Sequence, residues 1–394
     1  MQINRKYLAR MDFLLLFFTV IVLILGMNMV YSSSSYRAEK LFENNAHYLQ
    51  KHIVRLGIGV VVMVIFALVD YRRWLILSPL FFWFGFALLI MLFLPLPFVV
   101  TSKGASRWMN VGFMTIQPSD FARYALILVL ARVLTSERDK LENFWGGFLK
   151  IFFLVALIVV PVAFEKDLGT AALIMLIAFA MFYIAEVRIS YILAAATSCV
   201  SAGLFYMGMN NYQFVRFENF VNMLLGDGDP GWHLRQSLIS FAEGGFLGKG
   251  LGYGQQKYEF LPEAHKDFIF SVVGEELGFI GTTVTLLFFC LIFYRGIRIA
   301  QYAPNGYARL LAGGISICIG AYAFINAAVA LALLPTTGIP MPFMSYGGSA
   351  LVSHLAAVGI LLNISMQGSK SYSRQEHWQV YNKRLKRPVF SSMG

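Results

Sequence analysis

The sequence predicts an all-α protein that crosses a membrane about ten times, and three observations support this fold class. Apolar residues make up 58% of the 394 residues and charged residues only 13%, whereas soluble domains contain about 45–50% and about 25%. The mean hydropathy is +0.65. Apolar runs of the roughly 20 residues needed to cross a bilayer follow one another along the chain. This composition excludes an ordinary soluble enzyme of two or three domains.

Ten apolar runs are predicted to be membrane-spanning helices. The first is longer than the roughly 7–15 apolar residues of a signal peptide, so we expect it to be retained. The fourth is the least apolar because Asp120, Arg123 and Arg132 interrupt it. Glu165, Lys166 and Asp167 alone separate the fifth run from the sixth, which predicts a tight helical hairpin. The predicted spans are residues 12–31, 52–70, 74–96, 117–134, 149–164, 168–186, 189–209, 268–293, 308–334 and 347–367.

Basic residues predict how the chain is oriented. The net charge is +11, and Lys and Arg gather in short connections on one side, as they do on the cytoplasmic side of membrane proteins. Anionic lipid explains them better than nucleic acid. An even number of spans puts both termini on that side of the cytoplasmic (inner) membrane. We expect a cytoplasmic N-terminus (1–11), a ten-helix membrane domain (12–367) with an outer loop at about 210–267, and a basic cytoplasmic tail (368–394).

Gly-, Pro- and charge-rich sequence collects in the connections predicted to face outward, so we expect any chemistry on the outer face. ATP is not supplied there, and the sequence lacks a P-loop, which argues against an ATP-driven pump. Cys199, Cys290 and Cys318 lie inside apolar runs and offer neither a disulfide framework nor zinc-ligand spacing. The outward connections are residues 97–116, 164–167, 210–267 and 335–346.

The segment directly before the eighth span is rich in titratable residues. It contains Glu259, Glu263, His265, Lys266 and Asp267. Asp267 lies where the chain enters the membrane, and two interpretations are open. It can cap the helix N-terminus, or it can act as a general base, because partial desolvation raises the pKa of a carboxyl group toward a useful value.

Glu275 and Glu276 follow in the same span, about 12 Å deeper than Asp267. Charged groups at such a depth are costly and usually face the interior of a bundle or a cavity. We favour a structural role, in which the two acids are protonated or paired and hold helices together. A proton or ion pathway is the alternative.

A second group of polar residues occupies the connection after the third span. Arg107 beside Trp108 suits a phosphate-bearing lipid headgroup, because a guanidinium can bind phosphate oxygens in bidentate fashion and an indole anchors at the interface. An ordinary interfacial anchor is the alternative. The sequences Gln117-Pro-Ser-Asp120 and Asp167-Leu-Gly-Thr170 are each typical of a helix start.

Two further segments carry candidate residues. The run from Pro335 to Ser349 contains too much Pro and Gly for a helix and is predicted to be a re-entrant loop or a rigid turn. Asn326 lies in the span before it. The run from Gly231 to Gly248 is predicted to include a short amphipathic helix at the outer surface.

Four of these runs together resemble the SEDS family of shape, elongation, division and sporulation proteins. They are Asp167–Thr170, Leu261–Phe270, Gly274–Gly278 and Gly338–Ser349, and the resemblance covers about residues 12–368. It implies ten transmembrane helices with the large outer loop between the seventh and eighth. It also implies a peptidoglycan glycosyltransferase that polymerises lipid II.

The resemblance further implies partners and a cellular role. Lipid II, undecaprenyl-linked glycan and a class B penicillin-binding protein, a transpeptidase, are the expected partners, with other divisome proteins. The segment Met29–Ser33 and the basic tail are most similar to the division branch, which places the protein at the septum. An elongation or a sporulation role is the alternative.

Site residues follow from the same resemblance. Asp267 matches the catalytic Asp, Glu259 becomes a second candidate carboxylate, and Arg107 and Trp108 match the outer-loop Arg-Trp pair. Charge that develops on the leaving diphosphate would need Arg107, Arg216 or a divalent cation held with the substrate phosphates; the sequence has no cofactor motif. Further candidates for substrate binding are Lys103, Gln117, Ser119, Asp167, Gln236, Glu263, His265, Ser345, Gly347, Gly348 and Ser349, and those for a structural or cavity role are Glu275, Glu276, Asn326, Pro340 and Pro342.

The chain departs from the family pattern at four places, one of which is Thr337, where some division members carry Lys. Lys266 stands where Thr is common, Glu165-Lys166 where Gln-Pro is common, and Asp120 with Arg123 where Glu and Lys are common. Two other classes of function compete with the enzyme. A lipid II flippase would use Glu275, Glu276 and Asp167 as relay groups, but it should need polar groups in both halves of the membrane. A scaffold would not need acids at the membrane boundary.

Overall fold

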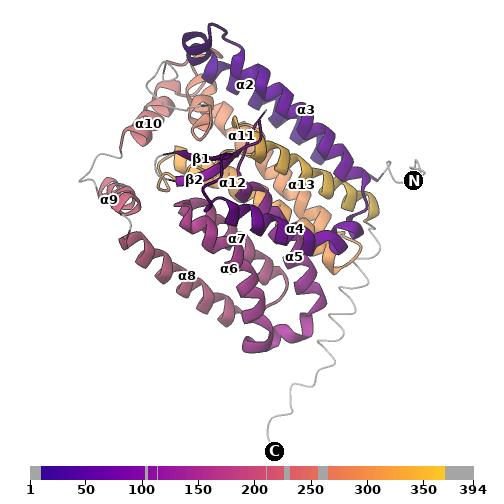
Figure 1. Ribbon diagram of the computed structural model, residues 1–394. Helices are drawn as coiled ribbons and strands as arrows, with labels where there is room; N and C mark the ends of the chain where they lie inside the picture. Colours follow the sequence, from indigo (N-terminus) through magenta and orange to yellow (C-terminus); the bar gives the residue numbers. More distant parts are fainter. Residues whose placement is uncertain are drawn as a thin grey trace, which may run out of the picture.

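The computed structural model describes residues 10–102, 105–112, 114–209, 211–225, 231–255 and 265–368. The chain forms a helical bundle in which every predicted span is a helix (Figure 1). Eight described helices are long and apolar enough to cross a membrane, where α6 is counted together with the π-helical turn Phe144–Phe148 that precedes it. Helix α7 is apolar but shorter, and α5 carries three charged residues. The ten helices are α2 (Phe13–Phe42), α3 (His47–Leu68), α4 (Tyr71–Met91), α5 (Pro118–Ser136), α6 (Leu149–Phe164), α7 (Leu168–Ile184), α8 (Ile189–Met209), α11 (Ile269–Gln301), α12 (Gly306–Ala330) and α13 (Gly348–Gln367).

Helix α12 lies inside the bundle because small residues let its neighbours come close. A Cβ atom at Gly314 would lie 2.8 Å from Met181 Sδ on α7 and 2.9 Å from Ile127 Cγ2 on α5. Close approach at small residues is the usual basis of helix packing in membranes. Helix α8, in contrast, lies at the edge of the bundle (Figure 1) and buries only Ile192 and Ala195 among its residues.

The two ends of the membrane domain meet on one face. The backbone N–H of Asp12, which caps α2, donates to Ser365 Oγ near the end of α13 at 3.1 Å. Arg295 Nη2 on α11 binds the Asp12 carboxylate at 2.6 Å. The start and the end of the bundle therefore lie on the same side, as an even number of spans requires.

A small antiparallel sheet, which was not predicted, occupies the connection between α4 and α5. Strand β2 (Ala105–Asn110) lies between β1 (Val99–Ser102) and β3 (Thr115–Ile116). Trp108 is paired with Val100. Short β-branched runs at both ends of the connection are a weak strand signal, which the Gly and polar residues between them obscured.

The loop predicted to face outward contains two helices, α9 (Asn211–Leu225) and α10 (Trp232–Gly244). The second confirms the predicted amphipathic helix, whereas α9 was not predicted. The polar residue Ser237 on the buried face of α10 bonds to Ser271 Oγ of α11 at 2.6 Å and donates to the carbonyl of Ala330 at 2.5 Å. Helix α10 is therefore fixed to the start of α11 and to the end of α12.

Helix α11 is interrupted at Gly278, which has φ 67° and ψ −162°. This break frees backbone groups that a continuous helix would pair, and the segment after α10 binds them. The N–H groups of Lys249 and Gly250 donate to the carbonyls of Glu275 and Glu276, each at 3.0 Å. The N–H of Phe279 donates in turn to the carbonyl of Gly245 at 2.9 Å. The backbone N–H and carbonyl groups of the broken helix and of the loop thus pair with each other, because unpaired backbone groups within a membrane are costly.

The side chains of Glu275 and Glu276 strengthen the same junction. Glu276 accepts hydrogen bonds from Ser32 Oγ of α2 at 2.5 Å and from the N–H of Gly252 at 3.0 Å. Glu275 accepts a hydrogen bond from the N–H of Gln255 and forms an ion pair with Lys249. These contacts fit the predicted structural role, because both acids join α11 to a loop or to a neighbouring helix.

We predict that Gly278→Ala destabilises the protein by roughly 1–3 kcal/mol from backbone strain alone. A Cβ atom there would also lie 2.3 Å from the backbone nitrogen of Gly248. Gly203→Ala on α8 is the matched control, since a Cβ atom at Gly203 meets nothing within 4 Å. Thermal unfolding in detergent compares the two variants, and equal melting temperatures would refute this account of the junction.

Candidate functional site

The connections predicted to face outward meet at one end of the bundle, which we call the rim (residues 105–117, 165–170, 265–268 and 335–349, where described). The dipeptide Thr337-Gly338 lies at its centre. A Cβ atom at Gly169, at the start of α7, would lie 2.7 Å from Thr337 Cβ. A Cβ atom at Gly338 would lie 3.6 Å from Asp267 Oδ2. Asp267 and the α6–α7 turn therefore flank the same two residues.

Asp267 is half-buried at the rim. The N-cap residue of α11 is Phe268, which makes no side-chain cap bond, so the predicted capping position of Asp267 was wrong by one residue. The helix begins later because residues 265–268 form a turn. Asn326 Nδ2 donates to the backbone carbonyl of Asp267 and to that of Ile339, both at 2.8 Å. Asn326 thereby fixes the backbone on which the Asp267 carboxylate is mounted.

The Pro- and Gly-rich run, which includes Pro340 and Pro342, contains no helix before α13, as predicted. Ser345 Oγ accepts a hydrogen bond from the N–H of Met341 at 2.8 Å, and Phe343 has a φ of 63°. Gly347 is the N-cap residue of α13, whose first residue is Gly348. Ser345 and the two glycines thus shape this turn.

Three rings and one guanidinium border the turn, and of these four side chains only His265 was among the predicted site residues. The buried ring of His265 lies 5.0 Å from that of Tyr48 and 5.4 Å from that of Tyr346, measured between centroids. The Arg55 guanidinium lies over the Tyr346 ring at 4.6 Å. Burial raises the pKa of the Tyr346 hydroxyl, and Arg55 opposes this effect. Tyr48 and Arg55 had no local signal, because α3 meets the turn only through the tertiary fold.

The α6–α7 turn is a compact motif that the strand β2 holds in place. Lys166 has a φ of 62°, and the N–H of Asp167 donates to the carbonyl of Val162 at 3.4 Å, as at many helix C-termini. Asp167 then caps α7 through the N–H of Thr170 at 3.2 Å. Arg107 donates from Nε to the carbonyl of Glu165 at 3.0 Å and from Nη2 to that of Lys166. The predicted helical hairpin is confirmed.

A chain of hydrogen bonds leads from this turn into the bundle. Gln117 Nε2 donates to Asp167 Oδ2 at 3.3 Å, and the backbone N–H of Gln117 donates to Ser349 Oγ at 3.1 Å. Ser349 donates to Asp120 Oδ2 at 2.7 Å. Asp120 Oδ1 binds Arg123 Nη1 at 2.9 Å. Three predicted site residues, Gln117, Asp167 and Ser349, therefore belong to one network.

Arg123 is the buried end of this network, with 1% of its surface exposed. It donates to the Tyr322 hydroxyl of α12 and lies 3.3 Å from His354 Nε2 of α13. The hydroxyl of Tyr124 lies 2.7 Å from the other ring nitrogen of His354. A guanidinium in an apolar interior requires such partners, because an unpaired buried charge is costly.

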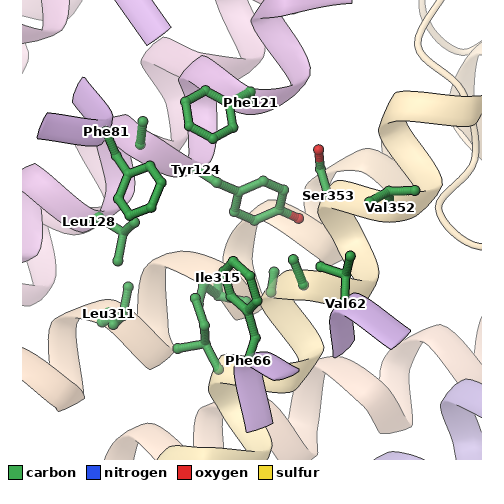
Figure 2. Close-up of a pocket in the computed structure, with 14 residues that line it drawn as sticks. Val62, Phe66, Phe81, Phe121, Tyr124, Leu128, Leu311, Ile315, Val352 and Ser353 are labelled. Atoms are coloured by element: carbon green, nitrogen blue, oxygen red, sulfur yellow. The ribbon is translucent and has the colours of Figure 1, made fainter. Parts of the chain in front are cut away.

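An apolar cavity of about 240 Å³ lies beside this cluster, between α3, α4, α5, α12 and α13. Figure 2 shows the rings of Phe66, Phe81 and Tyr124 around a common space. Val352 and Ala356 of α13 line it as well. The cavity is almost entirely lined by carbon, so it suits a hydrocarbon chain rather than a polar ligand.

The remaining predicted residues either lie outside this hydrogen-bond network or belong to segments that the structure does not describe. Arg216 is on α9, at the edge of the molecule (Figure 1), and Gln236 is buried on α10. Ser119 is buried, and its hydroxyl finds no partner among the described residues. In the same residues no group of three or more His, Cys, Asp or Glu could hold a metal ion. Lys103, Glu259 and Glu263 lie outside the described residues.

We predict that Arg123→Leu destabilises the protein by about 3–5 kcal/mol, because it leaves Asp120 buried without its charge partner. Arg123→Leu combined with Asp120→Leu should cost less than the sum of the two single changes. The exposed pair of Arg138 with Glu186, at 2.9 Å, is the control and should contribute less than about 1 kcal/mol. Additive free energies of unfolding at Asp120 and Arg123 would show that the two residues are not coupled.

Comparisons with known proteins give the family. Residues 13–370 match the FtsW, RodA and SpoVE family, described as "Cell cycle protein". The "Probable peptidoglycan glycosyltransferase FtsW" of Geobacter sp. (strain M18) is 38% identical over 354 residues, which are 90% of this chain and 96% of that protein. "Stage V sporulation protein E" of Bacillus subtilis (strain 168) is 36% identical over the same shares of the two chains.

Solved structures agree in fold. A chain of the complex described in "Structural coordination of polymerization and crosslinking by a peptidoglycan synthase complex" has a TM-score of 0.75 at 24% identity and covers 92% of this chain and 99% of its own. The rod shape determining protein RodA of Thermus thermophilus has a TM-score of 0.67 at 22% identity, with 92% and 98% covered. The chain therefore belongs to the FtsW, RodA and SpoVE family of integral membrane proteins, as its resemblance to the SEDS family predicted.

Proposed function

We propose that this protein is a peptidoglycan glycosyltransferase that polymerises lipid II at the outer face of the cytoplasmic membrane. The name of the Geobacter relative supports this activity. The observation that carries the proposal is the position of Asp267, a half-buried carboxylate at the rim whose backbone is fixed by Asn326. A base held in this way can accept a proton without reorganising.

The proposed reaction is a single inverting displacement. Asp267 removes the proton from the 4-hydroxyl of the acceptor GlcNAc, and this oxygen attacks C1 of the donor MurNAc. The bond from C1 to the undecaprenyl diphosphate breaks, so an α-linked donor gives a β-linked product. One base suffices, and no covalent intermediate with the enzyme forms.

Arg107 is the residue we assign to the negative charge of the leaving diphosphate. It uses two N–H groups to hold the α6–α7 turn, and a guanidinium has five. The remaining donors can bind phosphate oxygens. A divalent cation held by the substrate phosphates would share this charge with Arg107.

The apolar cavity is the place we propose for part of an isoprenoid chain. It is lined by apolar side chains of α3, α4, α5, α12 and α13. Tyr124 both lines the cavity and contacts His354, so the bound lipid would lie against the same network that reaches the rim. The hydrophobic effect, rather than any polar contact, would drive this binding.

The cellular setting is part of the proposal. We infer that both termini are cytoplasmic, that a class B penicillin-binding protein works with this chain, and that the pair acts at the division septum. The solved complex of a peptidoglycan synthase supports a polymerase that works beside a crosslinking partner. A flippase is less well supported, because Glu275 and Glu276 are engaged in joining α11 to the 245–255 loop.

We predict that Asp267→Asn abolishes glycan polymerisation while the protein still folds and binds its partner. The amide keeps the size of the carboxylate but cannot accept the proton, and general-base catalysis is worth about 10²–10⁴-fold in rate. Polymerisation of fluorescent lipid II in proteoliposomes, with a partner whose transpeptidase site is inactive, measures the effect. Asp70→Asn, at the start of α4, is the control. Glycan ladders of normal length from Asp267→Asn would contradict the assignment.

We predict that Ala356→Phe raises the KM for lipid II by roughly tenfold, about 1.4 kcal/mol of binding free energy, because the ring fills the cavity. Ala194→Phe on the exposed face of α8 is the matched control and should leave the KM unchanged. The comparison uses initial rates at several lipid II concentrations. An unchanged KM in a folded Ala356→Phe protein would place the lipid elsewhere.

A further inference from the structure

Glu165 in the α6–α7 turn is a buried acid that the proposed reaction does not use. Its side chain lies at the rim, yet the residue is only 3% exposed. Neither carboxyl oxygen has a hydrogen-bond partner among the described residues. A buried carboxylate without partners is costly, so such a group is expected to hold a proton or to bind a cation.

The groups around Glu165 are already engaged. Asp167 caps α7 with one carboxyl oxygen and accepts a hydrogen bond from Gln117 with the other. Arg107 donates to the backbone carbonyls of Glu165 and Lys166, and these bonds fix the turn rather than the Glu165 carboxyl group. Of the two acids in this turn, Glu165 is therefore the one placed to carry a proton.

The charges near Glu165 agree with this assignment. Burial first, and then the negative charge of Asp167, raise the pKa of Glu165 to about 9, although Arg107 lowers it. Arg107 comes from β2, Asp167 from the start of α7, and Lys166 lies between the acids in the turn. Asp120 of α5 is the next acid along the network, and Thr337 from the turn before α13 brings no charge.

We propose that Glu165 is a positioning residue that must hold a proton for the rim to bind an anionic diphosphate. With Glu165 neutral, the charges of Arg107 and Asp167 balance, and the free donors of Arg107 can bind phosphate oxygens. If Glu165 ionises, the turn that Arg107 holds carries a second negative charge beside that of Asp167. This charge repels the diphosphate. The choice of a diphosphate as the ligand rests on the proposed function, whereas the inference that Glu165 holds a proton does not.

Thermal unfolding of the full chain in nanodiscs tests for the proton without any substrate. Folding raises the pKa of this acid above its ordinary value of 4.5, so the folded state is stabilised by protonation and loses stability as pH rises from about 4.5 to 9. Glu165→Gln is neutral at every pH and lacks this loss. Its melting temperature should therefore exceed that of the wild type by several degrees more at pH 8 than at pH 5. Glu142→Gln, an exposed acid, is the matched control.

The KM for lipid II tests the consequence. In the wild type it should rise roughly tenfold more between pH 8 and pH 10 than in Glu165→Gln, as expected for loss of one proton with a pKa of about 9. Glu165→Ala should raise the KM at pH 8, and the rescue by Gln distinguishes a neutral polar group from mere filling of space.

Three results would overturn the proposal. The first is an equal effect of Glu165→Gln on the melting temperature at both pH values. The second is a steep rise of the KM above pH 8 in Glu165→Gln as well. The third is that MgCl₂ at pH 8 stabilises the wild type but not Glu165→Gln. This result would show that Glu165 binds a cation rather than a proton. If no variant polymerises lipid II, the proposed function fails, and the unfolding comparison still decides whether Glu165 holds a proton.

Discussion

The guanidinium of Arg123 is the constraint on which the arrangement of the central helices depends. It is almost fully buried in an apolar bundle, where a charge without partners is strongly destabilising. Asp120 neutralises it from the same helix, while Tyr322 and His354 approach it from α12 and α13. Three helices must therefore meet at one point and in one register, which packing of apolar side chains alone would not impose.

The same constraint extends to the rim. Asp120 holds Ser349 at the start of α13, Ser349 binds Gln117, and Gln117 binds Asp167 at the start of α7. Helix starts that belong to three different spans are thereby fixed relative to one another. The turn before α13, with Gly338 against Asp267, lies inside this frame. Such support of reacting groups by a second layer of contacts is what positions them for catalysis.

The sequence predicted those parts of the structure that depend on hydrophobicity. It predicted less of the parts that depend on contacts between distant segments. Apolar runs located all ten helices, and Asp167-Leu-Gly-Thr170 predicted a capped start because capping is local. The end of α2 at Phe42 and the kink at Gly278 were not predicted. Polar residues at the end of a helix leave no periodic signal in the sequence, and neither do hydrogen bonds between a loop and a broken helix. Tyr48 and Arg55 reach the site only through packing of α3. Glu165 stood out as a departure from the family pattern, but its burial could not be read from its neighbours in sequence.

The central claim is that Asp267 is the base, and a structure of the full chain with two non-reactive lipid II analogues bound would test it most directly. The account predicts the acceptor 4-hydroxyl within hydrogen-bonding distance, about 3 Å, of an Asp267 carboxyl oxygen, with the donor diphosphate at Arg107. An acceptor bound away from Asp267, or lipid II held against Glu275 and Glu276 within the membrane, would contradict it and favour transport over polymerisation.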